Sequence, residues 1–254
     1  MFFLQRAAPS NPSSLAYLFG CGGKGHAIAV DVHAEDVDWF LQQAAQQAVK
    51  IDYVIDTHIH ADHVSGGREL AQRCGGAYCL HESSTPQFAF TALKDGQMLT
   101  IGNVTAQVLH TPGHTADSIC LLVADNRRSA EPWFLLSGHT LFVGSAGRPD
   151  LRGEEERMGG LLHDSIFNKL LTLPDHVEIF PGAQAGSVCG AGISGKPSST
   201  IAFEKRFNTA LVADKGEFVA AILGNLPPQP EGMAEIIRQN VIASSKRGKM
   251  AKSQ

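Results

Sequence analysis

The sequence predicts an α/β fold in which strand-rich layers are covered on the outside by helices. Short apolar segments bounded by Gly, Pro and Asn recur along the chain, as β-strands do. Segments with apolar residues at helical spacing lie between groups of these strands, which indicates separate layers of helix and sheet. The 254 residues contain no internal repeat and no long linker, so we expect residues 1–243 to form one domain.

The amino-terminal part of the chain predicts four strands and two helices. The strands are expected at residues 2–5, 15–19, 26–32 and 51–56. Val37, Phe40, Leu41 and Ala44 recur at helical spacing and predict a helix over residues 35–49. Two consecutive glycines at 66–67 predict a tight turn before a short helix at 68–73.

The remaining two thirds continue this alternation. Further strands are expected at residues 77–80, 98–101, 104–109, 118–124, 133–136 and 177–180. Helices are predicted at about 160–171, 201–223 and 230–243, and a loop rich in Gly and Ser at 183–200. Residues 244–254 carry four basic residues and almost nothing apolar, which predicts a flexible basic tail.

The composition excludes several classes of protein. With 43% hydrophobic and 18% charged residues, the chain is neither disordered nor a highly charged coiled coil. A net charge of −4 offers no electrostatic basis for binding nucleic acid. No apolar run approaches the ~20 residues of a membrane span, and the first residues are too short an apolar run for a secretory signal. Five scattered cysteines without a CxxC pair favour a reducing compartment, so we expect a cytoplasmic protein.

The densest group of candidate metal ligands directly follows the strand at 51–56. His58, His60, Asp62 and His63 fall within six residues, at the point where the chain must turn. Imidazole and carboxylate are ligands for zinc, iron and manganese. A polar turn whose histidines face water is the alternative, but three His and one Asp in this register favour a metal site.

Three further strand ends are followed by a Gly-containing turn. The first turn carries His114, the second carries His139, and the third, Pro181-Gly182-Ala183, has no ligand. Because strands hold the geometry of a site better than loops do, we expect the four strand ends to meet at one locus.

These motifs resemble the metallo-β-lactamase superfamily over residues 2–183. The resemblance rests on THxHxDH at 57–63, TPGHT at 111–115, a GxT turn and a PG turn. It implies an αββα sandwich, in which two mixed β-sheets pack together with helices on both outer faces. The segment GSAGRPDL at 144–151 is similar to the GRxD segment of glutathione persulfide dioxygenases, and residues 186–206 resemble the bacterial members of that group.

The resemblance also implies which residues bind metal. Superfamily members hold a first metal with three imidazoles that match His58, His60 and His114. They hold a second metal with residues that match Asp62 and His63, together with a bridging Asp and a further His. This chain has His139 and Ala183 at those last two positions, so a two-metal hydrolase is disfavoured.

In the persulfide dioxygenases, one iron is held at the positions that match His58, His114 and His139, with an Asp at the last of them. We therefore expect one metal per chain on these three imidazoles, with His60 as a ligand or near neighbour and a vestigial second position at Asp62 and His63. Fe(II) is the expected metal and Zn(II) the alternative, because a three-imidazole site suits both.

Three functions follow from this resemblance. The leading hypothesis is an iron-dependent dioxygenase that uses O₂ to oxidise glutathione persulfide to sulfite and glutathione. The first alternative is a mononuclear zinc hydrolase of the glyoxalase II kind, which would cleave a glutathione thioester with Asp62 as the base. The second is a degenerate, non-catalytic binding module. In each case the partner is a glutathione-derived small molecule, and the oligomeric state stays open, with a homodimer as one option.

Residues beyond the ligands are candidates for substrate binding. The guanidinium of Arg148 can grip a glutathione carboxylate, and the alternative is an ion pair with Asp150 or Glu154. Lys196 and Ser199 are candidates to line the substrate mouth, although a Ser-rich segment is often just a loop.

Cys189 is the last candidate and lies in a Gly-rich loop. Its sulfur could meet the sulfur of a persulfide. We favour the alternative of a small unreactive cysteine, because nothing near it in the sequence lowers the pKa of its thiol.

Overall fold

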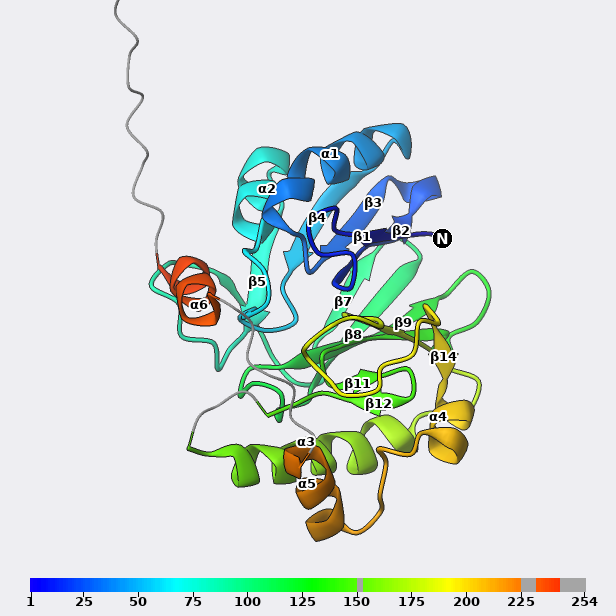
Figure 1. Ribbon diagram of the computed structural model, residues 1–254. Helices are drawn as coiled ribbons and strands as arrows, with labels where there is room; N and C mark the ends of the chain where they lie inside the picture. The colour runs from blue at the N-terminus through cyan, green and yellow to red at the C-terminus, as the bar shows by residue number, and fades with distance from the viewer. Residues whose placement is uncertain (150–152, 225–231, 243–254) are drawn as a thin grey trace, which may run out of the picture.

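The computed structural model describes residues 1–149, 153–224 and 232–242. It contains two six-stranded sheets that pack face to face, with α1 and α2 outside the first sheet and α3, α4 and α5 beyond the second (Figure 1). This confirms the predicted α/β class with two mixed sheets between helical layers. Among the described residues, no helix is long and apolar enough to cross a lipid bilayer.

The first sheet has the strand order β1-β2-β3-β4-β5-β6. Its strands are β1 (Phe2–Ala7), β2 (Leu15–Cys21), β3 (His26–Val30), β4 (Lys50–Ile55), β5 (Ala77–His81) and β6 (Thr91–Leu93). Strands β1 to β3 form an antiparallel meander, whereas β3 to β6 run parallel. The parallel crossovers contain the helices α1 (Val37–Gln46) and α2 (Gly67–Cys74). The 3₁₀ turns Gly22–Lys24 and Ala34–Asp36 flank β3.

The second sheet has the strand order β14-β13-β10-β9-β8-β7. Its strands are β7 (Met98–Ile101), β8 (Val104–His110), β9 (Ile119–Asp125), β10 (Phe134–Gly138), β13 (Glu178–Pro181) and β14 (Ser199–Thr200). Strands β8 and β10 are both antiparallel to β9, and β13 is parallel to β10. The carboxyl ends of β8, β10 and β13 therefore lie at the same edge of this sheet.

A two-stranded hairpin and the carboxyl-terminal helices complete the fold. The hairpin pairs β11 (Leu141–Phe142) with β12 (Ser145–Ala146). The helices are α3 (Glu155–Asn168), α4 (Ile201–Phe207), α5 (Lys215–Gly224) and α6 (Met233–Val241), with a 3₁₀ turn at Leu170–Thr172.

Alternating side chains of the buried strands separate the apolar core into layers. On β2, Tyr17 and Phe19 pack into the core between the sheets, whereas Leu18 belongs to the cluster that includes Phe40 of α1 and Leu70 of α2. This follows from the strand period of two, which sends neighbouring side chains to opposite faces. A separate cluster joins α3 to α5.

Several predicted boundaries were wrong because tertiary contacts decide them. The helix expected at 201–223 is two helices, since Asn208 ends α4 with its side-chain amide donating to Ser145 O (3.0 Å) and Glu204 Oε2 (2.7 Å). The strand expected at 26–32 stops at Val30, where Asp31 adopts a φ of 54°. The expected loop at 183–200 ends in β14, and β6 and the hairpin were not predicted. The predicted basic tail at 244–254 lies outside the described residues.

Candidate metal centre

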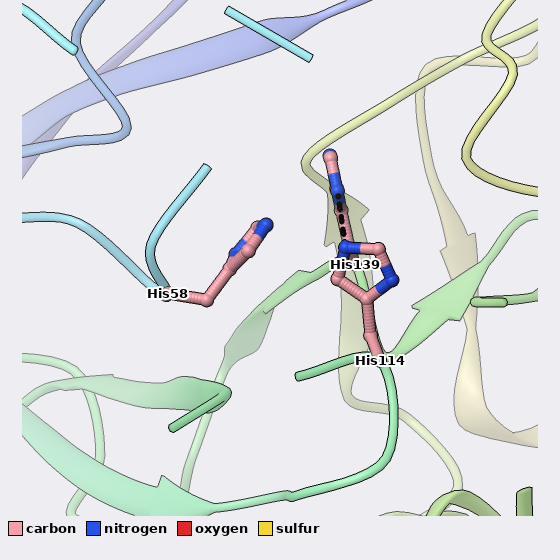
Figure 2. Close-up of side chains that lie close together, drawn as sticks. All are labelled: His58, His114 and His139. Atoms are coloured by element: carbon pink, nitrogen blue, oxygen red, sulfur yellow. Dashed lines mark hydrogen bonds between the residues drawn. The ribbon is translucent and has the colours of Figure 1, made fainter. Parts of the chain in front are cut away.

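Three strand ends bring His58, His114 and His139 together. His58 follows β4 of the first sheet, whereas His114 and His139 follow β8 and β10 of the second. All three are buried, and one ring nitrogen from each lies within 4.8 Å of those of the other two. Figure 2 shows the three imidazoles facing a common point, with His139 Nδ1 3.3 Å from His114 Nε2.

A hydrogen bond across the two sheets holds the His58 loop against the second sheet. The Ile119 N–H of β9 donates to Thr57 O at 2.8 Å. Gly138, at the end of β10, has a φ of +50°, and a Cβ atom there would lie 2.9 Å from Thr57 Oγ1. Glycine is therefore required on both conformational and steric grounds where the two ligand-bearing strands approach.

Neighbouring groups fix the orientation of two of these imidazoles. The Thr57 hydroxyl lies 3.0 Å from Asp31 Oδ2, to which it donates, and 3.0 Å from His58 Nδ1, from which it accepts. His114 Nδ1 donates to the carbonyl oxygen of Arg148 at 2.7 Å, because a carbonyl can only accept. Both rings therefore carry their proton on Nδ1 and keep the Nε2 lone pair for a metal.

Burial also favours the neutral form of two imidazoles of this set, His58 and His139. It lowers the pKa of His58 well below its usual value and that of His139 to about 3. Neutral imidazole is the form that binds a metal ion. His58 and His139 are therefore in the form that coordinates a metal ion.

His60, Asp62 and His63 form a second cluster beside the first. Their ligand atoms also lie within 4.8 Å of one another, and His63 Nδ1 is 3.1 Å from Asp62 Oδ1. The His60 ring centroid lies 4.3 Å from that of His58. The ring of His33 packs edge-on against His63, with the two centroids 3.8 Å apart. His60 thus lies next to the three-imidazole set, and its ligand atom groups with those of Asp62 and His63.

Asp31 is one residue of this site that the sequence analysis did not identify. Its Oδ1 accepts from the Thr57 N–H at 2.7 Å and lies 3.1 Å from His60 Nε2. Burial would lower the pKa of His60, but the Asp31 carboxylate raises it to about 9. In many metal sites, a carboxylate accepts a hydrogen bond from the ring nitrogen of a ligating histidine that does not face the metal. The signal in the sequence was a lone acidic residue inside an otherwise apolar segment.

Unpartnered buried atoms support metal binding at this locus. Among the described residues, His58 Nε2, His60 Nδ1, Asp62 Oδ2 and His63 Nε2 are buried without a hydrogen-bond partner. Such atoms are destabilising unless a cation or another partner compensates them. Because imidazole and carboxylate are ligands for zinc and for iron, the residues present fit either metal.

The loop that carries His60 and His63 is also held from the carboxyl-terminal helix. On α6, the side-chain amide of Asn240 donates to His60 O and His63 O, both at 2.9 Å. Its carbonyl oxygen accepts from the Ser65 N–H at 2.9 Å. One side chain thus satisfies three backbone groups of the ligand loop.

The other predicted site residues differ in their surroundings. Arg148 is buried, and its guanidinium donates to Val188 O at 3.3 Å. Lys196 is exposed in the loop before β14, where Ser199 pairs with Ile179. Of the alternative partners for Arg148, Asp150 lies outside the described residues and Glu154 pairs with Arg157. Arg148 therefore ties the ligand loops together, and its contact with substrate stays a prediction.

Ala183 occupies the fourth strand end. It is fully buried and packs in a small apolar cluster with Phe142 and Cys189. The Phe142 ring centroid lies 5.6 Å from that of His139. This side of the centre is thus an apolar wall where the resemblance implies a further histidine.

Comparison with known proteins agrees with this fold and site. A family model described as the Metallo-beta-lactamase superfamily matches residues 16–182. The hydroxyacylglutathione hydrolase of Nitrosococcus oceani is 27% identical over 239 residues, which cover 84% of this chain and 87% of that protein. The persulfide dioxygenase ETHE1 of Homo sapiens is 25% identical over 219 residues, which cover 86% of this chain and 79% of that protein.

Two solved structures extend the likeness over nearly the whole chain. The crystal structure of ETHE1 from Myxococcus xanthus has a TM-score of 0.81 and 29% identity, covering 94% of this chain and 98% of that one. A metallo-β-lactamase structure from Staphylococcus aureus has a TM-score of 0.89 and 30% identity, covering 96% of this chain and 73% of that one. Together with the two-sheet fold and the histidine centre, these matches show that the chain belongs to the metallo-β-lactamase superfamily.

Proposed function

We propose that this protein is a dioxygenase with one Fe(II) per chain, which uses O₂ to oxidise glutathione persulfide to sulfite and glutathione. The observation that carries the proposal is the convergence of His58, His114 and His139, three buried imidazoles at the positions that the resemblance to persulfide dioxygenases assigns to iron. Three donors on one face leave coordination positions for both a sulfur ligand and O₂, as in other non-haem iron oxygenases.

The chain's own residues prepare this centre. When bound, Fe(II) would supply the redox chemistry that joins O₂ to the terminal sulfur. Thr57 and the Arg148 carbonyl hold His58 and His114 in the tautomer that points Nε2 at the metal position. Phe142 packs beside His139 and keeps water from that side. The rings therefore need little rearrangement when substrate binds, which is the advantage of a preorganised site.

The relatives support a glutathione-derived substrate. Both a hydroxyacylglutathione hydrolase and a persulfide dioxygenase are similar to most of the chain. We assign recognition of the glutathione portion to Arg148, Lys196 and Ser199. Arg148 lines a cavity of about 270 Å³ whose other walls come from the loop at Gly190 and from Ala221 and Ile222 of α5. The five cysteines form no disulfide, which supports a reducing compartment such as the cytoplasm.

A zinc-dependent thioester hydrolase is the second candidate. It is favoured by Asp62, whose Oδ2 is buried without a hydrogen-bond partner and is therefore available to take a proton from water. A three-imidazole site also holds zinc with an open fourth position for that water. The similarity to hydroxyacylglutathione hydrolase agrees with this chemistry.

The test combines metal analysis with two activity measurements. Protein produced without added metal is analysed for iron and zinc, then assayed for oxygen uptake with glutathione persulfide and for hydrolysis of a glutathione thioester. We expect iron and oxygen uptake, both of which His58→Ala should abolish. Zinc with thioester hydrolysis would favour the hydrolase, and neither metal nor activity would indicate a binding module.

A further inference from the structure

We propose that Cys189 completes a second cation position with Asp62 and His139, and that this position binds Zn(II). The Cys189 sulfur, a carboxylate oxygen of Asp62 and a ring nitrogen of His139 lie within 4.8 Å of one another. This set is distinct from the three-imidazole set and shares only His139 with it. The proposal goes beyond the dioxygenase function and does not depend on it.

The loop around Cys189 is built so that its thiol has a defined place. The Cys189 N–H donates to Ser187 Oγ at 3.1 Å, and its carbonyl accepts from the Arg148 N–H at 3.1 Å. On the next residue, Gly190, a Cβ atom would lie 2.9 Å from both Ala146 O and the Phe142 ring. The side chain of Cys189 is itself buried. The loop backbone is therefore pinned to the segment that also orients His114.

The small side chain of Ala183 accounts for the position of the Cys189 thiol. The resemblance to the superfamily implies a histidine at the position of Ala183, and the fully buried alanine supplies no metal donor there. Cys189 lies six residues further along the loop and packs directly in the cluster of Ala183 and Phe142. The Cys189 thiol on the following loop thus replaces the donor that the fourth strand end lacks. The motif spacing does not reveal this replacement, because Cys189 lies outside the motif.

Asp62 supplies independent support for a cation here. Its side chain is only 6% exposed, and Oδ1 is engaged by His63. Oδ2 is buried without a hydrogen-bond partner. Because a buried carboxylate oxygen is costly to leave uncompensated, its position beside a thiol and an imidazole points to a positively charged ligand.

The donor types select the metal. A thiolate, an imidazole and a carboxylate are all zinc ligands, and three protein donors leave the fourth tetrahedral position for water or substrate. Thiolate favours a softer ion than the all-imidazole set does. Since His139 belongs to both sets, occupation of one position is coupled to the geometry of the other.

Cobalt(II) is the probe that tests this site, because a cobalt–thiolate bond produces a charge-transfer band in the near ultraviolet. Metal-free protein is titrated with Co(II) in the absence of any substrate. We expect the band in the parent protein and in His58→Ala, which alters only the three-imidazole set. We expect it to disappear in Cys189→Ser and on addition of an excess of Zn(II).

A matched control separates Cys189 from the other thiols. Cys74 is half-buried at the end of α2, so Cys74→Ser should keep the band. Asp62→Asn should weaken Co(II) binding even if Cys189→Ser folds poorly, and circular dichroism checks the fold of each variant. Absence of the band in the parent protein at saturating cobalt, or its persistence in Cys189→Ser, would overturn the proposal. Neither result bears on oxygen uptake, so the two proposals fail independently.

Discussion

At the scale of single residues, the centre depends on the atoms that hold the far side of each imidazole. Thr57 holds His58, Asp31 holds His60, and the Arg148 carbonyl holds His114. Asp31 contributes most to this arrangement, because its carboxylate also accepts hydrogen bonds from the N–H and from the hydroxyl of Thr57. Removing its charge therefore acts on two imidazoles at once.

We predict that Asp31→Asn weakens metal binding about 10- to 100-fold, the usual effect of losing a carboxylate behind a histidine ligand. The free energy of unfolding should fall by about 1–3 kcal/mol, because buried donors lose their charged acceptor. Competition with a chelator measures the first quantity and urea unfolding the second. Asp52→Asn is the matched control, because Asp52 contacts His26 at a partly exposed site on β4. Equal metal affinity in Asp31→Asn and the parent protein would contradict this role.

His139 allows a second test at this scale. We predict that His139→Asp keeps one iron per chain and raises the rate of oxygen uptake, because the carboxylate removes one positive unit from the centre and favours higher oxidation states of iron. Iron analysis and oxygen uptake with glutathione persulfide measure the two effects. His139→Asn has the same shape without the charge and serves as the control. A rate in His139→Asp no higher than in the control would show that charge is not the decisive property.

At the scale of elements, the edge of the second sheet and the helix α6 together position the metal-directed histidines. Strands β8 and β10 deliver His114 and His139, and the Asn240 side chain on α6 holds the loop between β4 and α2. Asn240 is 175 or more residues from its partners in sequence. A helix at the far end of the described chain thus shapes the ligand loop.

We predict that Asn240→Ala lowers the free energy of unfolding by about 1–3 kcal/mol, because the variant leaves buried backbone groups of the ligand loop without partners. It should also weaken metal binding. Gln239→Ala is the control, since the Gln239 side-chain amide donates to Glu235 within the same helix. Urea unfolding and chelator competition apply to both variants. If Asn240→Ala matched Gln239→Ala in both measurements, the clamp would have no energetic importance.

The elements also show what local sequence can and cannot predict. Apolar periodicity located β4, β8 and β10, and with them the strand ends that carry the histidines. It could not predict that Asn208 breaks the expected helix, because its partner Ser145 is remote in sequence. The roles of Asp31 and Asn240 are likewise set by long-range hydrogen bonds. The proximity of Cys189 to Asp62 depends on the path of a loop, and the periodicity of apolar residues does not predict the paths of loops.

At the scale of the whole molecule, apolar packing supports the fold. The central core lies between the two sheets, and separate clusters join the first sheet to α1 and α2 and join α3 to α5. None of these clusters includes a metal-directed side chain. The metal-directed residues project from the ends of strands that the core already fixes.

We therefore predict that chelation removes metal without unfolding the protein. Metal that binds only the folded state stabilises it by about 2.7 kcal/mol when its free concentration is 100 times its Kd, so removal should lower the Tm by the equivalent of that energy and leave a cooperative transition. Thermal unfolding followed by circular dichroism, with and without chelator, measures this. His58→Ala is the control, because it should fold, bind no metal at the three-imidazole set and respond far less to the chelator. A chelated protein without a cooperative transition would mean that the metal is structural, as in small zinc domains, and that the two-sheet core is insufficient by itself.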